Sequence, residues 1–225
     1  MTTLRLDGVG FVYPDGTRAL EGVDLTIGPG ESVAIIGQNG SGKSTLVRQL
    51  DGLLRPTEGR VLHDDQDIAG ARVAALAATV GIVFQNPDRQ IFAGTVRREV
   101  EFGPRRLGRE GAELEAAVEA ALAAVDLADA ADTNPYDLGY TRRKLLTLAS
   151  VLAMGTPVVV LDEPTPGQDS DGQARLREIV ANLATEGRTV VAVSHDRTFI
   201  ADAFQRVVVL EEGRVIADGS AAILR

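Results

Sequence analysis

The sequence lacks cysteine and has few basic residues for its size. Lysine and arginine number 23 against 32 aspartates and glutamates, which gives a formal net charge of −9. Without cysteine the chain can form no disulfide, no thiolate metal site and no thiol nucleophile, a pattern that fits a cytosolic protein. An extended nucleic-acid interface is not expected either, because a protein that binds a duplex normally presents a basic face.

Hydrophobic runs of membrane-spanning length are also missing. No stretch approaches the roughly 18 unbroken apolar residues that cross a bilayer. The N-terminal MTTLRLDGVG lacks the apolar core of a signal peptide. We therefore expect a chain that is soluble by itself and that serves a membrane only through a partner.

What is present predicts an α/β fold in one domain. Hydrophobic residues make up 44% of the 225-residue chain, which is enough to bury an ordinary core. Apolar and polar residues alternate in LRLDGVGFVY, and the chain turns at residues 14–16 before VDLTI, which indicates antiparallel strands. The run SVAIIG is continuously apolar, as in a strand buried on both faces of a parallel sheet.

The later segments complete a mixed sheet with a helical insertion. Residues 95–127 are rich in Ala, Glu, Arg and Leu and are predicted to be mostly helical. Further strands are expected at VVVLDEP, TVVAVSHD and RVVVLEEGRVIADG, the last of which forms a hairpin about Glu212 and Gly213. We expect one domain over residues 1–225, with a core at about 1–85 and 156–225 and a helical subdomain at about 86–155.

The strongest chemical signal is a glycine-rich loop between a predicted strand and a predicted helix. It reads GQNGSGKST at residues 37–45 and has the spacing of the phosphate-binding loop of P-loop NTPases. Glycines let successive backbone N–H groups converge on phosphate oxygens. Lys43 supplies positive charge to the β- and γ-phosphates and Ser44 offers a hydroxyl to Mg²⁺. The expected nucleotide-binding residues are Gly37, Gln38, Asn39, Gly40, Ser41, Gly42, Lys43, Ser44 and Thr45.

A nucleotide site that hydrolyses also needs a carboxylate near the metal and a group that activates water. The apolar strand VVVL ends in Asp162 and Glu163. We expect Asp162 to hold the Mg²⁺ shell and Glu163 to act as general base towards the attacking water. The alternative is a pair of acids in a solvated turn.

Two histidines occur in the sequence. His63 lies in the polar stretch HDDQD and is predicted to be a surface residue. His195 ends the strand TVVAVS, where the strand ends of an α/β sheet meet the ligand. From its position alone, a structural role and a contact with phosphate both remain open for His195.

These motifs together resemble the nucleotide-binding subunits of ABC transporters. The phosphate loop, Gln85 in IVFQNPD, the strand-end acids, Asp169 and His195 occur in that family's order and rough spacing. The resemblance implies ATP and Mg²⁺ as cofactors and a head-to-tail pair of subunits that clamp ATP between them. It further implies that Gln85 couples the Mg²⁺ site to a transmembrane partner and that His195 contacts the γ-phosphate. Asp169 would lie in the loop joining the two ATP sites, and Tyr13 would stack on adenine.

A narrower resemblance concerns FQNPDRQIFAGTVRREVEFGPRRLG. This stretch is similar to ATPases of energy-coupling-factor transporters and their cobalt and nickel relatives, whose substrates are vitamins and transition-metal ions. The resemblance implies that residues 86–107 form the groove for a coupling helix of a membrane subunit. It also implies a second ATPase subunit and a substrate-binding membrane subunit as partners, at the inner face of the cell membrane.

The segment DLGYTRRK departs from the family's usual signature, Leu-Ser-Gly-Gly-Gln. Glycine replaces the serine and bulkier residues replace the two glycines, so the expected contacts with the partner's ATP are altered. Thr141 is a plausible N-cap of the following helix. The cations at residues 142–144 then crowd the positive end of the helix dipole, where Asp137 or a partner-bound triphosphate would compensate them. The signature residues are Leu138, Gly139, Tyr140, Thr141 and Arg142.

Three functions therefore compete. The first is an ATPase subunit that drives import of a vitamin or metal ion through membrane partners. The second is a soluble ABC-type ATPase acting on ribosomes or DNA, although two cassettes or a long coiled-coil insertion, usual in such proteins, are absent from the sequence. The third is a small-molecule kinase or GTPase, but the Asn-Lys-x-Asp segment that reads guanine is absent.

Overall fold

The computed structural model describes residues 2–221. The strands are β1 (Leu4–Val12), β2 (Arg18–Ile27), β3 (Ser32–Ile36), β4 (Glu58–His63), β5 (Gln66–Asp67), β6 (Val80–Val83), β7 (Val158–Asp162), β8 (Thr189–Val193), β9 (Arg206–Glu211) and β10 (Arg214–Ser220). The α-helices are α1 (Lys43–Leu50), α2 (Val73–Leu76), α3 (Val96–Arg106), α4 (Gly111–Ala124), α5 (Tyr140–Met154), α6 (Ser170–Thr185) and α7 (Arg197–Ala203). Short 3₁₀ helices are η1 (Pro87–Arg89), η2 (Ala128–Ala130) and η3 (Pro135–Asp137).

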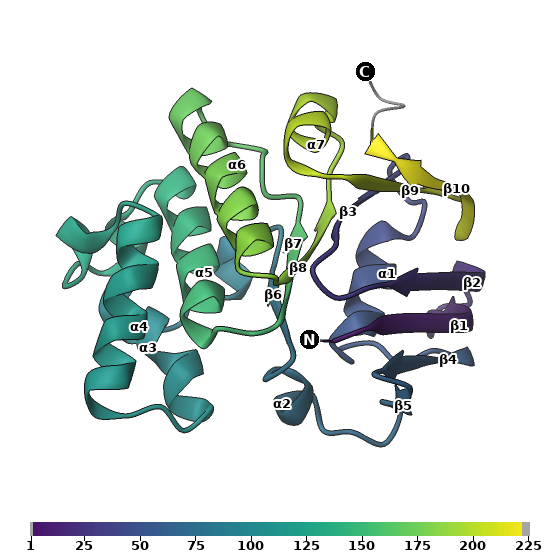
Figure 1. Ribbon diagram of the computed structural model, residues 1–225, viewed down its shortest axis with the longest axis horizontal. Helices are drawn as coiled ribbons and strands as arrows, with labels where there is room; N and C mark the ends of the chain where they lie inside the picture. The colour runs from purple at the N-terminus through teal and green to yellow at the C-terminus, as the bar shows by residue number, and fades with distance from the viewer. Residues whose placement is uncertain (1, 222–225) are drawn as a thin grey trace.

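A mixed sheet in the order β10-β9-β3-β8-β7-β6 runs through the middle of the molecule (Figure 1). Strands β9, β3, β8, β7 and β6 are parallel, and β10 returns antiparallel to β9. Along β7, Val159 and Leu161 enter one hydrophobic core whereas Val158 and Val160 enter another. The central strands are thus buried on both faces, which confirms the prediction made from their continuous apolar runs.

An antiparallel sheet in the order β2-β1-β4-β5 covers one side of this layer together with α1 (Figure 1). In β2 the residues Leu20, Val23, Leu25 and Ile27 face the shared core, and their alternation is interrupted between Leu20 and Val23, where the pairing with β1 is irregular. This is the half-buried strand pattern expected from alternating sequence. The carboxyl end of β3 and the start of α1 therefore lie against a rigid double layer of strands.

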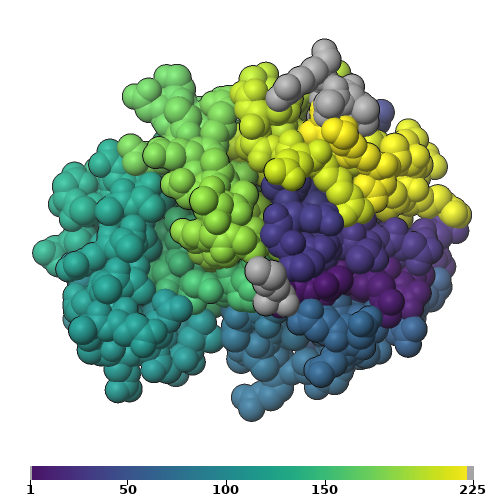
Figure 2. All heavy atoms as spheres, in the orientation of Figure 1, coloured from purple at the N-terminus to yellow at the C-terminus, as the bar shows by residue number. Residues whose placement is uncertain are grey.

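Helices α3 to α7 contribute to the core on the opposite side of the central sheet. Residues 86–155 carry the helices α3, α4 and α5, which form the part of the molecule farthest from the N-terminal strands (Figure 2). In α4 the apolar residues Leu114, Val118 and Leu122 recur at helical spacing and are buried. This arrangement confirms the predicted helical insertion. Within residues 2–221, no helix combines the length and the apolar character needed to cross a membrane.

The prediction for His63 is wrong. Its side chain is buried at the end of β4, and its Nε2 lies 2.8 Å from the carbonyl oxygen of Leu50. Burial lowers the pKa of the imidazole. The polar neighbours in sequence face solvent, but β4 pairs with β1 and directs this one ring inward against the end of α1.

Asp51, directly after α1, is a buried carboxylate whose titration should affect stability. Its Oδ1 accepts a hydrogen bond of 2.9 Å from the Leu53 N–H, and burial raises its pKa to about 6 from 3.8. Between these two values the folded protein binds more protons than the unfolded chain, so its stability falls as pH rises through this window. Asn at this position keeps the acceptor and carries no charge.

We expect Asp51→Asn to raise the free energy of unfolding at pH 7.5 by about 2 to 3 kcal/mol, and to change it much less at pH 4. Urea unfolding of both proteins at the two pH values measures this difference. An equal effect at pH 4 and 7.5 would show that Asp51 does not titrate in the folded protein as its burial indicates.

Candidate functional site

The phosphate loop occupies the turn between β3 and α1, as predicted. Gly37 and Gly42 have φ angles of 153° and 101°, in a region that favours glycine. A Cβ at Gly37 would collide with the Leu210 carbonyl, and one at Gly42 with the Ala19 carbonyl. The two glycines therefore allow the loop to lie close against β9 and β2.

Lys43 points back into this loop. Its Nζ donates hydrogen bonds of 2.9 Å and 2.8 Å to the carbonyls of Gly37 and Gln38. Burial lowers the pKa of the ammonium, and the charges of Glu163 and Asp162 oppose that shift. The loop thus concentrates a desolvated positive charge beside the N-terminus of α1, which is the arrangement that attracts an anion.

Asp162, the last residue of β7, contacts the end of the phosphate loop. Its Oδ1 accepts a 3.0 Å hydrogen bond from the Ser44 hydroxyl. Its Oδ2 is buried and has no hydrogen-bond partner in the part of the chain described here. Burial is the main cause that raises the pKa of this carboxyl. A buried carboxylate with a free oxygen next to a serine hydroxyl matches the oxygen-rich chemistry that Mg²⁺ takes.

Glu163 follows in a strained backbone conformation, with a φ angle of 52°. Its N–H donates to the Val193 carbonyl at 2.9 Å, so the strand pairing with β8 continues into the strained residue. Its carboxylate Oε2 lies 2.9 Å from Nδ1 of His195, whose side chain is 67% exposed. The structure therefore brings His195 to the candidate general base, and within residues 2–221 the Nε2 of this ring makes no hydrogen bond.

A cavity of about 330 Å³ joins these elements. It is lined by Tyr13, Thr17, Arg18, Ala19, Asn39, Gly40, Gly42, Lys43, Ser44, Thr45, Gln85 and Glu163. Tyr13 lies at its edge, with the phenol oxygen 2.8 Å from the Thr45 hydroxyl. The sequence pattern does not predict the three residues 17–19. The turn at residues 14–16, which returns the chain towards the loop, is the signal that could have indicated them.

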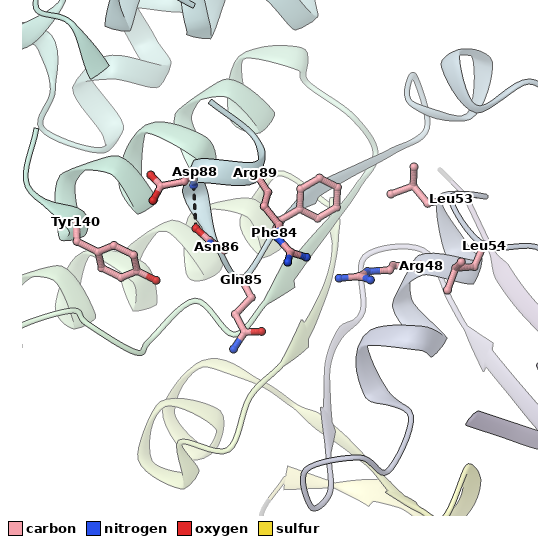
Figure 3. Close-up of a pocket in the computed structure, with 9 residues that line it drawn as sticks. All are labelled: Arg48, Leu53, Leu54, Phe84, Gln85, Asn86, Asp88, Arg89 and Tyr140. Carbon is pink, nitrogen blue, oxygen red and sulfur yellow. Dashed lines mark hydrogen bonds between the residues drawn. The ribbon is translucent and has the colours of Figure 1, made fainter. Parts of the chain in front are cut away.

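Gln85 also faces a larger cavity of about 680 Å³ between α1 and the start of α5 (Figure 3). Figure 3 shows Tyr140 on one side of this space and Arg48, Leu53 and Leu54 on the other, with Gln85 between them. The glutamine is thus a shared wall of the two cavities. A side chain in this position borders both the cavity at the phosphate loop and the cavity at the start of α5.

The segment DLGYTRRK corrects two predictions. Gly139, not Thr141, is the N-cap of α5, and the Thr141 hydroxyl donates 2.6 Å to the Gly167 carbonyl. Two of the three cations, Arg142 and Arg143, pair with acids distant in sequence rather than with Asp137. Arg142 pairs with Asp129 at 2.7 Å, and Arg143 pairs with Asp88 at 3.1 Å.

Asp169 lies in the loop between β7 and α6, where it is the N-cap of α6. Its Oδ1 accepts a 2.9 Å hydrogen bond from the Gly172 N–H. Such a contact satisfies one of the free donors at a helix start. Within a single subunit Asp169 therefore has a capping role, and any contact with a second ATP site requires a partner chain.

The fold and the loop define a P-loop nucleotide-binding protein, and comparison with known proteins narrows this class. The model of the family described as "ABC transporter" matches residues 20–166. The chain therefore belongs to the ABC transporter ATP-binding family, and it is an ATPase of that family. This confirms the predicted family, the fold and the use of ATP.

Several relatives bear energy-coupling-factor names. The chain is 40% identical over 219 residues to the energy-coupling factor transporter ATP-binding protein EcfA of Methanothermobacter thermautotrophicus, covering 96% of this chain and 70% of that protein. It is 39% identical to EcfA of Carboxydothermus hydrogenoformans, covering 98% of this chain and 82% of the relative.

Solved structures agree with this placement. The structure of cbiO1 from Clostridium perfringens, part of the ABC transporter complex cbiONQ, matches with a TM-score of 0.87 at 34% identity, covering 98% of this chain and 89% of that one. A dimeric post-hydrolysis state of the ATP-binding cassette MJ0796, bound to ADP and Pi, matches with a TM-score of 0.88 at 28% identity, covering 97% and 98%.

Proposed function

We propose that the chain is the ATP-hydrolysing subunit of an energy-coupling-factor importer, which takes up a vitamin or a transition-metal ion. The observation that carries this proposal is the convergence of Lys43, Ser44, Gln85 and Glu163 on one cavity. The identity to EcfA proteins over nearly the whole chain supports the importer class. The subunit would lie at the inner face of the cell membrane, held there by its membrane partners.

The nucleotide would lie in the cavity next to the phosphate loop. Lys43 would exchange its two carbonyl contacts for the β- and γ-phosphates, helped by the backbone N–H groups of the loop. Tyr13, at the edge of the cavity, would stack on the adenine ring. Its hydrogen bond to Thr45 holds the ring close to the start of α1.

Ser44, Asp162 and Gln85 would hold Mg²⁺. The fit rests on the hydrogen bond between Ser44 and Asp162, the unpartnered Oδ2 of that aspartate in the described chain, and the place of Gln85 on the cavity wall. When bound, the ion neutralises phosphate charge. The buried position of Asp162 keeps its carboxylate fixed towards the loop.

Glu163 would accept the proton of the attacking water. The carboxylate borders the cavity, and Nδ1 of His195 restricts its orientation. The free Nε2 of His195 would then contact the γ-phosphate. The two side chains therefore act as a pair: the histidine orients both the base and the phosphate.

A second ATPase subunit would complete each site. Residues 138–142 of one chain would contact the ATP held by the other, and Asp169 would lie in the loop that joins the two sites. Because Tyr140 and Thr141 replace small residues, this chain's contribution to the partner's site is altered, whereas its own phosphate loop and Glu163 follow the family pattern. The two ATP sites of such a dimer would be unequal if the partner carries the usual signature.

An apolar cavity of about 240 Å³ supports docking to a membrane subunit. Phe92 and Phe102 line it, are 60% and 42% exposed, and contact each other edge to face. Such aromatic pairs at the surface are typical of interaction sites. Both lie within residues 86–107, where we expect the coupling helix of the transmembrane partner to bind.

Purification of the tagged chain from its native membrane tests this function. We expect integral membrane proteins to co-purify, and Phe92→Asp to lose them because a charge enters the apolar groove. Ile216→Asp is the matched control, since Ile216 on β10 is similarly exposed, at 56%. Co-sedimentation with ribosomes or DNA, without membrane subunits, would favour the alternative of an ATPase acting on those assemblies.

A further inference from the structure

Lys144 is an unusual residue for this chain. The sequence contains 21 arginines but only two lysines, Lys43 and Lys144, and both are buried. Lysine is rarely buried without an anionic partner. No carboxylate lies within ion-pair distance of Lys144 in the described residues. Instead its Nζ donates 2.7 Å to the Glu163 carbonyl and 3.0 Å to the Pro166 carbonyl.

The segment that Lys144 contacts depends on outside donors. Residues 163–168 read EPTPGQ, and prolines at 164 and 166 have no N–H to donate to a local turn. Glu163 itself is held in the left-handed region, at a φ of 52°. Carbonyls of this segment are therefore available to donors outside it, and a buried ammonium with three donors can bind two of them at once.

Other residues of the same helical turn contact the same segment. The Thr141 hydroxyl donates to the Gly167 carbonyl at 2.6 Å, and the Gln168 amide donates to the Thr141 carbonyl at 3.4 Å. The ring of Tyr140 lies close to Gly167, since a Cβ on that glycine would be 3.0 Å from the ring. The first turn of α5 thus contacts the chain from Glu163 to Gln168, the segment that links the base to α6.

We propose that Lys144 is a positioning residue for Glu163, and that through it the altered signature turn controls the ATP site of its own chain. The inference rests on the proposed role of Glu163 as the base. The carbonyl contact from Lys144, the N–H contact to Val193 and the carboxylate contact to His195 hold Glu163 at three points. When the first turn of α5 moves in response to the partner's ATP, Glu163 in this chain's own ATP site would move with it, through the direct contact from Lys144.

The test uses the complex purified through a tag on this chain. Lys144→Met keeps length and apolar packing but removes the donors. We expect at least a tenfold fall in the Glu163-dependent kcat for ATP, with KM and the affinity for a fluorescent ATP analogue unchanged. Lys144→Arg, which retains N–H donors, should recover most of the loss. The double variant Lys144→Met/Glu163→Gln should be no slower than Glu163→Gln alone.

Leu146→Ala is the stability control. Leu146 lies two residues further along α5, is fully buried, and belongs to the hydrophobic core rather than to the contacts with residues 163–168. It should lower the unfolding temperature while the folded protein keeps its kcat. If Lys144→Met cannot be purified, Lys144→Gln, with two N–H donors and no charge, should give an intermediate kcat.

The outcomes separate this inference from the proposed function. A Lys144→Met kcat within twofold of wild type, beside an inactive Glu163→Gln, overturns the positioning role and leaves the base assignment in place. Equal losses of kcat in Leu146→Ala and Lys144→Met also overturn it, because helix stability alone would then explain both. Full turnover in Glu163→Gln overturns both assignments.

Discussion

Replacing Glu163 by glutamine should abolish ATP hydrolysis by this chain's site and preserve ATP binding. Glutamine keeps the size of the side chain and can still bond His195, but it cannot accept a proton from water. General-base catalysis typically contributes about 10²- to 10⁴-fold, so turnover should fall by at least 100-fold. The phosphate loop lines the same cavity and keeps all its residues in this variant, so ATP binding should persist.

Phosphate release and binding of a fluorescent ATP analogue measure the two effects separately. Glu119→Gln provides a control with the same chemical change at an exposed position on α4 and should behave as wild type. Where a second ATPase subunit contributes turnover, the corresponding change in that subunit isolates the site of this chain. Near-normal turnover in the isolated Glu163→Gln site would rule out Glu163 as the base.

Replacing Lys43 by alanine should weaken ATP binding itself. The ammonium donates to the carbonyls of Gly37 and Gln38, and among the described residues that line the cavity the other basic group, Arg18, lies on β2 outside the phosphate loop. Loss of a charge-assisted contact to phosphate costs roughly 1.5 to 3 kcal/mol, which corresponds to about a 10- to 150-fold weaker affinity. Hydrolysis at cellular ATP concentrations should fall with it.

Equilibrium binding of a fluorescent ATP analogue, with ATP as competitor, measures the change in affinity. Lys43→Arg is the informative comparison, because it keeps the charge but adds a planar group that the closely packed loop has little room for. We expect its affinity to lie between those of wild type and the alanine variant. An alanine variant that binds ATP with wild-type affinity would exclude the phosphate contact of Lys43.

The sequence was sufficient for those parts of the site that depend on local backbone geometry. A strand, a glycine-rich turn and a helix follow one another in the sequence. The φ angles of the turn and the start of the helix fix the directions of Lys43 and Ser44 relative to this unit. The apolar strand ending in Asp162 and Glu163 is equally local. In a parallel sheet the loops after neighbouring strands lie at the same edge, so the phosphate loop and the acids after β7 come together. The hydrophobic pattern predicts this because it indicates an α/β fold.

Contacts between residues far apart in sequence required the tertiary structure. Polar neighbours suggested that His63 is exposed, yet strand pairing buries it against Leu50. Proximity suggested Asp137 as the acid for the cations of DLGYTRRK, yet the folded chain supplies Asp88 and Asp129. Nearness along the chain is a weak guide here because side chains on a helix point in different directions. Only the packing of the helix determines which partner each side chain reaches.

Lys144 shows most clearly the difference between what the sequence predicts and what the tertiary structure decides. By sequence alone it is one of three cations at a helix start, equivalent to Arg142 and Arg143. This one side chain is buried on the inner side of α5, where it donates to the Glu163 and Pro166 carbonyls in the segment after β7, while its neighbours pair with acids. The sequence by itself determined the nucleotide chemistry, through local backbone geometry. Only the tertiary structure decided which cation meets the base, because helical rotation and burial distinguish residues that composition treats alike.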